Sequence, residues 1–202
     1  MKLTLVRHGA TQWNASRRFQ GHSDTPLSEE GRAQARALAA RLSKERVDAI
    51  YASDLSRALE TARIVAAPHV LDVRADARLR EFAFGAWEGL TWAEIVATRP
   101  HLDDASWTKA EFYEPEGGET FALVTARMRA FLDDAAAGEN GHAVVVTHAG
   151  ALHAALSALG LGPAAGEPAP RFSPASLTAV AMEGGRARLI TLNDVDHLDS
   201  TG

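Results

Sequence analysis

Short apolar segments that alternate with helical patterns are the feature that most limits how this chain can fold. Apolar runs cover residues 3–6, 47–52 and 143–146, and each run is followed by polar residues and then by a helical pattern. Strands that alternate with helices build a mainly parallel sheet with helices packed on its faces. We therefore expect an α/β fold, a three-layer αβα sandwich with a mainly parallel sheet.

The predicted helices have recognisable boundaries. Ser28 is a candidate N-cap, Pro68 ends an apolar periodicity, and Thr91 with Glu94 has the spacing of a capping box. Apolar residues recur at helical spacing in four segments, which are residues 35–42, 55–65, 121–132 and 152–159.

The last part of the chain has the pattern of a β-hairpin. Residues 177–182 and 187–192 are β-like and flank Gly184 and Gly185, so we expect a hairpin at one edge of the sheet. Residues 160–174, rich in Pro, Gly and Ala, are interpreted as a loop. With 202 residues, no internal repeat and no long linker, residues 1–202 are expected to form a single domain.

The composition argues against several classes of protein. The chain has no cysteine, which rules out disulfides, thiolate zinc sites and a cysteine nucleophile. Its net charge of -5 does not favour nucleic acid as a partner. The first apolar stretch breaks at Arg7, too early for a signal peptide, and no run has membrane-spanning length. We expect a cytoplasmic protein with no membrane partner; its oligomeric state stays open, with a homodimer among the options.

Two histidines follow apolar runs at corresponding positions. His8 comes between Arg7 and Gly9 after the first run, and His148 precedes Ala149 after the last. Ligands collect at the carboxyl ends of parallel strands, so the two imidazoles converge if their strands are neighbours. Two unrelated core histidines would be the plainer interpretation, but it does not explain why both occupy strand-to-helix turns.

Arg57 stands in the first turn of the helix predicted after residues 47–52. A cation at a helix N-terminus opposes the helix dipole and needs a compensating anion. A bound phosphoryl group would supply that anion, whereas a solvated surface charge is the alternative.

The segment LVRHGATQWN at residues 5–14 closely resembles the signature of the histidine phosphatase superfamily, also called phosphoglycerate-mutase-like. Further segments resemble other blocks of the family in the same order, and the resemblance covers the chain from residue 3 to about 192. These segments are FQG at 19–21, DTPLS at 24–28, SDLSRA at 53–58, LRE at 79–81, FGAWEG at 84–89 and VTHAG at 146–150.

The resemblance implies that His8 is the nucleophile and forms a phosphohistidine, while Arg7, Arg57 and His148 hold the phosphoryl oxygens. Nearby guanidinium groups keep an imidazole neutral, and only the neutral ring has a lone pair for attack. Arginine also offers a rigid fork of donors to the equatorial oxygens. Glu81 matches the general acid of the family.

Other roles are less strongly indicated. Glu88 and Glu94 lie close to Glu81 in sequence, and composition alone does not choose among the three carboxylates. The resemblance also suggests phosphate-side or substrate-side positions for five further residues, which are Gly9, Asn14, Gln20, Ser53 and Ala149.

The resemblance implies neither a cofactor nor a metal ion. His148 and His153 are close enough in sequence to suggest a metal site, but their spacing is not the i, i+4 pattern of zinc proteases and no carboxylate accompanies them. The remaining histidines are interpreted as structural or surface residues, namely His22, His69, His101, His142 and His197.

The family contains both phosphatases and phosphoglycerate mutases. Mutases carry a longer insertion after the general acid, rich in basic residues, whereas residues 90–119 offer only Arg99 and Lys109 among several acids. Aromatic side chains there suit an apolar or ring-bearing leaving group, or they simply pack against one another. They are Trp92, Trp107, Phe112 and Tyr113, with Phe84 and Trp87 just before them.

We therefore expect a phosphatase of small phosphomonoesters whose partner is a phosphorylated metabolite. The pattern is similar to that of α-ribazole and broad-specificity phosphatases. A phosphoglycerate mutase and a non-catalytic protein that binds phosphorylated ligands are the alternatives.

Overall fold

A six-stranded mixed sheet forms the centre of the protein in the computed structural model, which describes residues 1–99, 115–138, 141–164 and 167–198. The strand order is β3-β2-β4-β1-β5-β6. The strands are β1 (Lys2–Arg7), β2 (Ala49–Ala52), β3 (Val73–Ala75), β4 (His142–Thr147), β5 (Leu177–Glu183) and β6 (Arg186–Asp194).

The first four strands run parallel, and the predicted hairpin closes one edge of the sheet. β1 pairs in parallel with β4 and antiparallel with β5, and β6 continues the antiparallel edge. Gly184 and Gly185 have φ values of 56° and 74°, the left-handed pair that a two-residue hairpin turn requires. The sequence does not predict β3, because its three residues are at most half-buried and show no apolar alternation.

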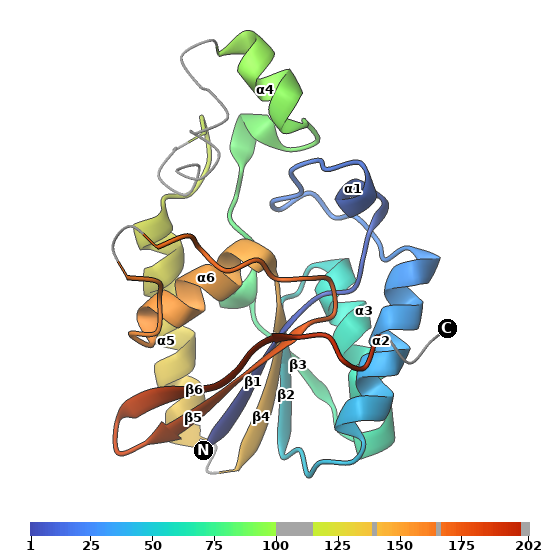
Figure 1. Ribbon diagram of the computed structural model, residues 1–202, viewed down its shortest axis with the longest axis vertical. Coiled ribbons are helices and arrows are strands. Elements are labelled where there is room, and N and C mark those ends of the chain that lie inside the picture. The colour runs from blue at the N-terminus through green and yellow to red at the C-terminus, as the bar shows by residue number, and fades with distance from the viewer. Residues whose placement is uncertain (100–114, 139–140, 165–166, 199–202) are drawn as a thin grey trace.

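Helices cover both faces of the sheet, which confirms the expected sandwich (Figure 1). α2 (Glu29–Leu42) and α3 (Ser56–Ala66) pack on one face, and α5 (Phe121–Gly138) and α6 (Ala149–Ala158) pack on the other. Alternation along β1 builds the two cores, because Leu3 and Leu5 join the α5–α6 side while Val6 joins the α2–α3 side.

The helix boundaries follow local chemistry. Ser28 caps α2 by accepting a hydrogen bond from the N–H of Gly31, and the Thr91–Glu94 capping box opens α4 (Trp92–Thr98). The α-helical geometry of α3 ends at Ala66, just before a 3-10 turn that contains Pro68. In the described part of the chain, no helix combines the length and the apolar character needed to cross a membrane.

Short elements lie between the main ones. α6 begins at Ala149, three residues before the expected start, and this makes His148 its N-cap. A single turn, α1, and the stretch around α4 lie beyond the carboxyl ends of the strands (Figure 1). The short elements are α1 (Gln12–Ala15) and the 3-10 helices η1 (Ala67–His69), η2 (Ala77–Leu79) and η3 (Gly85–Trp87).

Two glycines allow the backbone after β1 to touch the start of α2. A Cβ atom on Gly31 would lie 2.0 Å from the carbonyl oxygen of Ala10, and one on Gly9 would lie 2.4 Å from the carbonyl oxygen of Gly31. The same carbonyl of Ala10 accepts a hydrogen bond from the N–H of Ser28 at 2.9 Å. The start of α2 therefore lies against the backbone beside His8. A residue larger than glycine at position 9 or 31 would prevent this contact.

We expect Gly31→Ala to lower the free energy of unfolding by about 1–3 kcal/mol and to reduce activity, because the added methyl group must push the backbone near His8 aside. Urea unfolding measures the first effect. The control is Gly138→Ala, since a Cβ there meets no atom within 4 Å, and its effect should stay within about 0.5 kcal/mol. A Gly31→Ala protein as stable as the wild type would contradict the close contact.

Candidate active site

His8 and His148 meet at the carboxyl ends of two neighbouring strands. Arg7 lies opposite Thr147 in the parallel register of β1 and β4, and the N–H of His8 donates to the carbonyl of Thr147 at 2.9 Å. The two imidazole rings lie with centroids 5.1 Å apart at an angle of 60°. Both rings are buried, with 3% and 0% of the residue exposed.

Arg57 is fully buried at the start of α3 and links a loop to His148. Its terminal nitrogens donate to the carbonyls of Gly21 at 2.7 Å and Ser23 at 2.9 Å, and its Nε donates to Nδ1 of His148 at 3.2 Å. Because Nδ1 of His148 accepts this bond, the neutral ring carries its proton on Nε2. The loop carbonyls thus stabilise a buried cation that also sets the tautomer of the neighbouring histidine.

Two buried donors at this place have no hydrogen-bond partner among the described residues: Nε of Arg7 and Nε2 of His148. Arg7 is otherwise anchored by its Nη1, which donates to the carbonyl of Phe172 at 2.5 Å. An unsatisfied buried donor costs free energy, so such a pair needs an explanation. A phosphate-like anion carries the acceptor oxygens that donors of this kind lack.

The surroundings keep both imidazoles neutral. Burial first, and then the charges of Arg57 and Arg7, hold the pKa of His8 well below its ordinary value. Burial and Arg57 act in the same direction on the pKa of His148. Nδ1 of His8 lies 2.7 Å from the carbonyl oxygen of Gly9, so Nδ1 carries the proton and Nε2 keeps the lone pair.

Burial lowers the pKa of Arg57 to about 10, which leaves the guanidinium charged at neutral pH. The pKa of Arg7 is also lowered, again mainly by burial. The site therefore combines two fixed cations with two neutral rings, one of which is a potential nucleophile.

Glu81 lies next to this cluster, at the N-terminus of α6. Its carboxylate accepts hydrogen bonds from the backbone N–H groups of Gly150 at 3.1 Å and Ala151 at 3.0 Å, and from Phe82 at 3.0 Å. The side chain is nearly buried, with 8% of the residue exposed. A helix N-terminus favours a carboxylate, and the N-cap of this helix is His148.

Glu88 and Glu94 are engaged elsewhere. The carboxylate of Glu88 accepts bonds from Ser23 and from the N–H groups of His22 and Phe84. Burial alone would raise the pKa of Glu88, but these bonds outweigh it and the pKa is lowered. Glu94 caps α4 and pairs with Arg18. Of the three carboxylates left open by the sequence, Glu81 is the one beside the histidines.

The pattern of residues along the chain agrees with a known family. Residues 3–195 match the histidine phosphatase superfamily, branch 1. The chain belongs to this superfamily. The family expected from the sequence is thereby confirmed, and relatives named as phosphatases confirm the phosphatase class.

Relatives of this histidine phosphatase carry names of both expected kinds, phosphatase and phosphoglycerate mutase-like. The chain is 36% identical to a metal-independent phosphoserine phosphatase of Arabidopsis thaliana over 208 residues, covering 100% of this chain and 84% of the relative. It is 35% identical to phosphoglycerate mutase-like protein 4 of the same plant, covering 100% and 88%. A mycobacterial glucosyl-3-phosphoglycerate phosphatase solved with VO3 superposes with a TM-score of 0.87 at 38% identity, covering 95% of this chain and 98% of that one.

Asn14 and Gln20, expected on the phosphate side of this histidine phosphatase, are fixed by threonines. Oδ1 of Asn14 accepts bonds from the N–H and hydroxyl of Thr11 in a capping box. Oε1 of Gln20 accepts bonds from the hydroxyls of Thr11 at 3.0 Å and Thr25 at 2.5 Å. The amide NH2 group of Gln20 is then the end left to donate to a ligand.

Gly9 and Ser53 form hydrogen bonds within the protein, and Ala149 is the first residue of α6. The N–H of Gly9 donates to the hydroxyl of Thr61 at 3.1 Å, so it is not offered to a ligand. Oγ of Ser53 accepts from the N–H of Leu55 at 3.3 Å and shapes the turn into α3. Ala149 presents its backbone at the helix N-terminus beside His148.

The aromatic residues before and within α4 pack mainly on one another. Trp87 is 3% exposed and forms a small core with Ile95, and its ring lies 6.2 Å from that of Trp92 and 5.7 Å from that of Phe19. The guanidinium of Arg99 stacks on Trp87 at 5.8 Å. Several other residues of the expected aromatic and charged segment lie outside the described residues, namely Trp107, Lys109, Phe112 and Tyr113.

His153, on α6, packs its ring 4.9 Å from that of Phe172. Within the described residues, no group of three or more His, Asp or Glu side chains is arranged to hold a metal ion.

Sequence reasoning missed the groups that hold these side chains. Carbonyls of Gly21, Ser23 and Phe172 anchor the two arginines, and His22 contacts the carbonyl of Glu81 at 2.9 Å. The sequence gives no sign of this contact of His22. A backbone carbonyl has no signature in sequence, because every residue has one.

We expect the stability of this histidine phosphatase to fall as the pH drops below about 6.5, because the unfolded histidines take up protons that the folded ones refuse. A histidine with a lowered folded pKa contributes full stability above its unfolded pKa and loses it at lower pH. His8→Gln removes one such group, so its free energy of unfolding should decline less steeply, by up to about 1.4 kcal/mol per pH unit. Urea unfolding between pH 8 and pH 5 measures both slopes, and identical slopes would contradict a neutral, buried His8.

Proposed function

We propose that this protein hydrolyses small phosphomonoesters through a phosphohistidine intermediate on His8. The observation that carries the proposal is the pair of buried, unpartnered donors, Nε of Arg7 and Nε2 of His148, beside a neutral imidazole whose Nε2 is free to attack. A phosphoryl group supplies acceptors for those donors and an electrophile for that lone pair.

In the first step, Arg7, Arg57 and His148 bind the oxygens of the phosphoryl group. Nε2 of His8 attacks phosphorus, and the bond between phosphorus and the ester oxygen breaks. Glu81, protonated at this stage, gives its proton to the departing oxygen, which leaves as an alcohol. The cationic donors stabilise the charge that spreads over the equatorial oxygens.

In the second step, Glu81 is a carboxylate and accepts a proton from a water molecule. That water attacks the phosphorus of the phosphohistidine, and the bond between phosphorus and nitrogen breaks. His8 returns to its neutral form, orthophosphate leaves, and Glu81 is protonated for the next cycle.

Hydrolysis is favoured over mutase transfer by the charge of the chain and by the names of its relatives. The net charge of -5 and the acidic composition of residues 90–119 disfavour retention of a multiply charged bisphosphate. Relatives named as phosphatases act on phosphoserine and on glucosyl-3-phosphoglycerate, which are small phosphomonoesters. One relative is named phosphoglycerate mutase-like, so transfer to a second sugar acid is the competing activity to assay.

We also propose that residues 1–202 act as one domain. One sheet joins β1, near the start of the chain, to β5 and β6, near its end, and this supports the proposal. The cytoplasmic location expected from the sequence stays a prediction.

Activity should persist in EDTA and be inhibited by vanadate and orthophosphate. Arginines and histidines stabilise the transferred charge in this mechanism, and vanadate imitates five-coordinate phosphorus in the same pocket. The assay is p-nitrophenyl phosphate turnover after exhaustive chelation. Loss of turnover that a divalent metal restores would overturn the mechanism.

His8→Ala and Glu81→Gln should fail at different steps. His8→Ala should form no phosphoenzyme, whereas Glu81→Gln should lower kcat/KM about 10²- to 10⁴-fold for poor leaving groups and much less for p-nitrophenyl phosphate. Rapid-quench labelling should find acid-labile phosphoenzyme accumulating in Glu81→Gln, because water is no longer activated. Equal labelling of both variants would exclude His8 as the covalent site, and an unimpaired Glu81→Gln would exclude Glu81 as the acid.

A further inference from the structure

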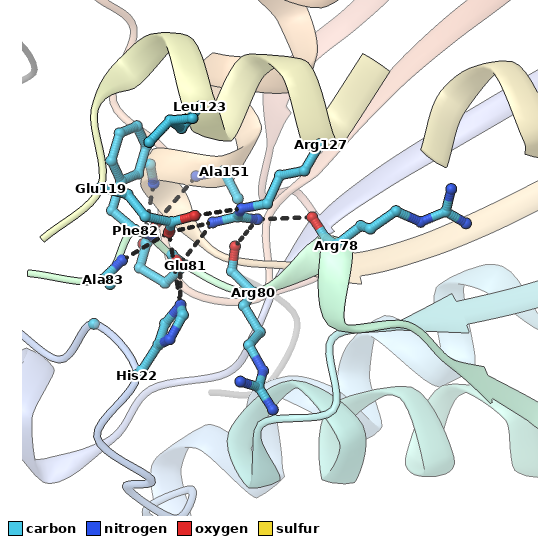
Figure 2. Close-up of polar contacts among 12 residues, drawn as sticks. His22, Arg78, Arg80, Glu81, Phe82, Ala83, Glu119, Leu123, Arg127 and Ala151 are labelled. Atoms are coloured by element: carbon cyan, nitrogen blue, oxygen red, sulfur yellow. Dashed lines mark hydrogen bonds and ion pairs between the residues drawn. The ribbon is translucent and has the colours of Figure 1, made fainter. Parts of the chain in front are cut away.

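Arg127, on α5, divides its N–H groups between the segment that carries Glu81 and the carboxylate of Glu119 (Figure 2). Its Nη1 donates to the carbonyls of Arg78 and Arg80, both at 2.7 Å, and its Nη2 donates to the carbonyl of Glu81 at 2.9 Å. Nε and Nη2 also donate to the two carboxylate oxygens of Glu119 at 3.0 and 2.9 Å. A guanidinium has five N–H donors, so none is left over.

Glu119 ties the same segment down at its other end. Its Oε2 accepts a bond from the N–H of Ala83 at 3.0 Å, and its own N–H donates to the carbonyl of Ala83 at 2.9 Å. Burial would raise the pKa of Glu119, but Arg127 and the N–H of Ala83 outweigh it, so the pKa is lowered. An ionised Glu119 therefore holds the fork of Arg127 and the backbone of Ala83 together.

These bonds replace regular secondary structure. Residues 80–84 belong to no helix or strand, so no ladder of backbone bonds sets their position. Both ionic groups are mostly shielded, with 17% of the Arg127 side chain and 22% of the Glu119 side chain exposed. A third contact comes from Nε2 of His22, which lies 2.9 Å from the carbonyl oxygen of Glu81.

The backbone and the side chain of Glu81 are thus fixed by different helices. Arg127 on α5 holds the carbonyl of Glu81, and the first turn of α6 holds its carboxylate through Gly150 and Ala151. A proton donor must lie within hydrogen-bond reach of the leaving oxygen, and small displacements reduce proton transfer sharply. The position of the Glu81 carboxyl group therefore depends on both contacts, the one at its backbone carbonyl and the one at its carboxylate.

We propose that Arg127, held in place by Glu119, is a positioning residue that sets Glu81 for proton transfer to the leaving group. The proposal rests on the proposed function, in which Glu81 is the general acid. Arg127 touches neither His8 nor the phosphoryl donors in any contact described above, so its loss should spare phosphate binding and impair the proton transfer.

The test uses Arg127→Lys, which keeps the positive charge but removes the planar fork and two of the five donors. We expect kcat/KM for phenyl phosphate to fall about 10- to 100-fold, and kcat/KM for p-nitrophenyl phosphate to fall less than about threefold, because the second leaving group scarcely needs a proton. The inhibition constant for vanadate should stay within about twofold. kcat/KM is the right quantity because it reports the step up to phosphoenzyme formation.

The matched control is Arg78→Lys. The side chain of Arg78 pairs with Asp76 and Asp134, and it makes no described bond to the backbone of residues 80–83. Both aryl phosphates should respond to this change alike. If Arg127→Lys lowers kcat/KM equally for both substrates, or leaves both unchanged, the positioning role is excluded.

Measuring Arg127→Lys in the Glu81→Gln variant as well distinguishes a failure of this inference from a failure of the proposed function. In Glu81→Gln, kcat/KM already falls steeply from p-nitrophenyl phosphate to phenyl phosphate, so adding Arg127→Lys should not widen the difference between the two substrates. A wider difference in the double variant would overturn the inference. If Glu81→Gln alone leaves that dependence unchanged, the general acid itself has been misassigned and the proposed function fails at that point. Should Arg127→Lys not fold, Glu119→Gln replaces it, since it keeps the side-chain shape and weakens the hold on Arg127, and the same selective loss is expected.

Discussion

Two buried guanidinium groups beside two neutral imidazoles are the interaction on which the rest of the site depends. Arg57 is fully buried and Arg7 is partly buried. Carbonyl oxygens of Gly21, Ser23 and Phe172 stabilise these cations. Carbonyl dipoles solvate a cation without cancelling its charge, so the field stays available to lower the pKa of both histidines and to attract a phosphoryl group.

The carbonyls that hold these arginines lie in segments without regular structure, so side chains must fix those segments. The carboxylate of Glu88 ties one of them, residues 21–23, to the segment before η3, because it accepts bonds from His22 and Ser23 on one side and from Phe84 on the other. The close approach of Gly9 and Gly31 fixes the backbone next to His8 from a third direction. The site is therefore organised before a ligand arrives, which is what electrostatic stabilisation of a transition state requires.

Two glutamates of this chain differ from a third, Glu81, in their surroundings. Glu88 and Glu119 accept bonds from several donors that lower their pKa, so they are ionised and act as fixed acceptors that connect segments. Within the described part of the chain, the carboxylate of Glu81 accepts bonds only from backbone N–H groups, and it lies at the helix end that begins with His148. Of the three, Glu81 is the one whose carboxyl group lies beside the two histidines.

The sequence by itself determined the layered fold and the residues that meet at the sheet edge, because apolar periodicity, caps and Gly184-Gly185 act over a few neighbouring residues. It missed β3, whose three residues have no apolar alternation, and it placed the start of α6 too late, because Gly150 disfavours a helix by propensity. The tertiary structure alone decided what holds the site. Arg7 meets the carbonyl of Phe172 across 165 positions, and Arg127 meets that of Glu81 across 46. Such bonds join a side chain to a distant backbone group that every residue possesses, so only the folded arrangement selects the partner.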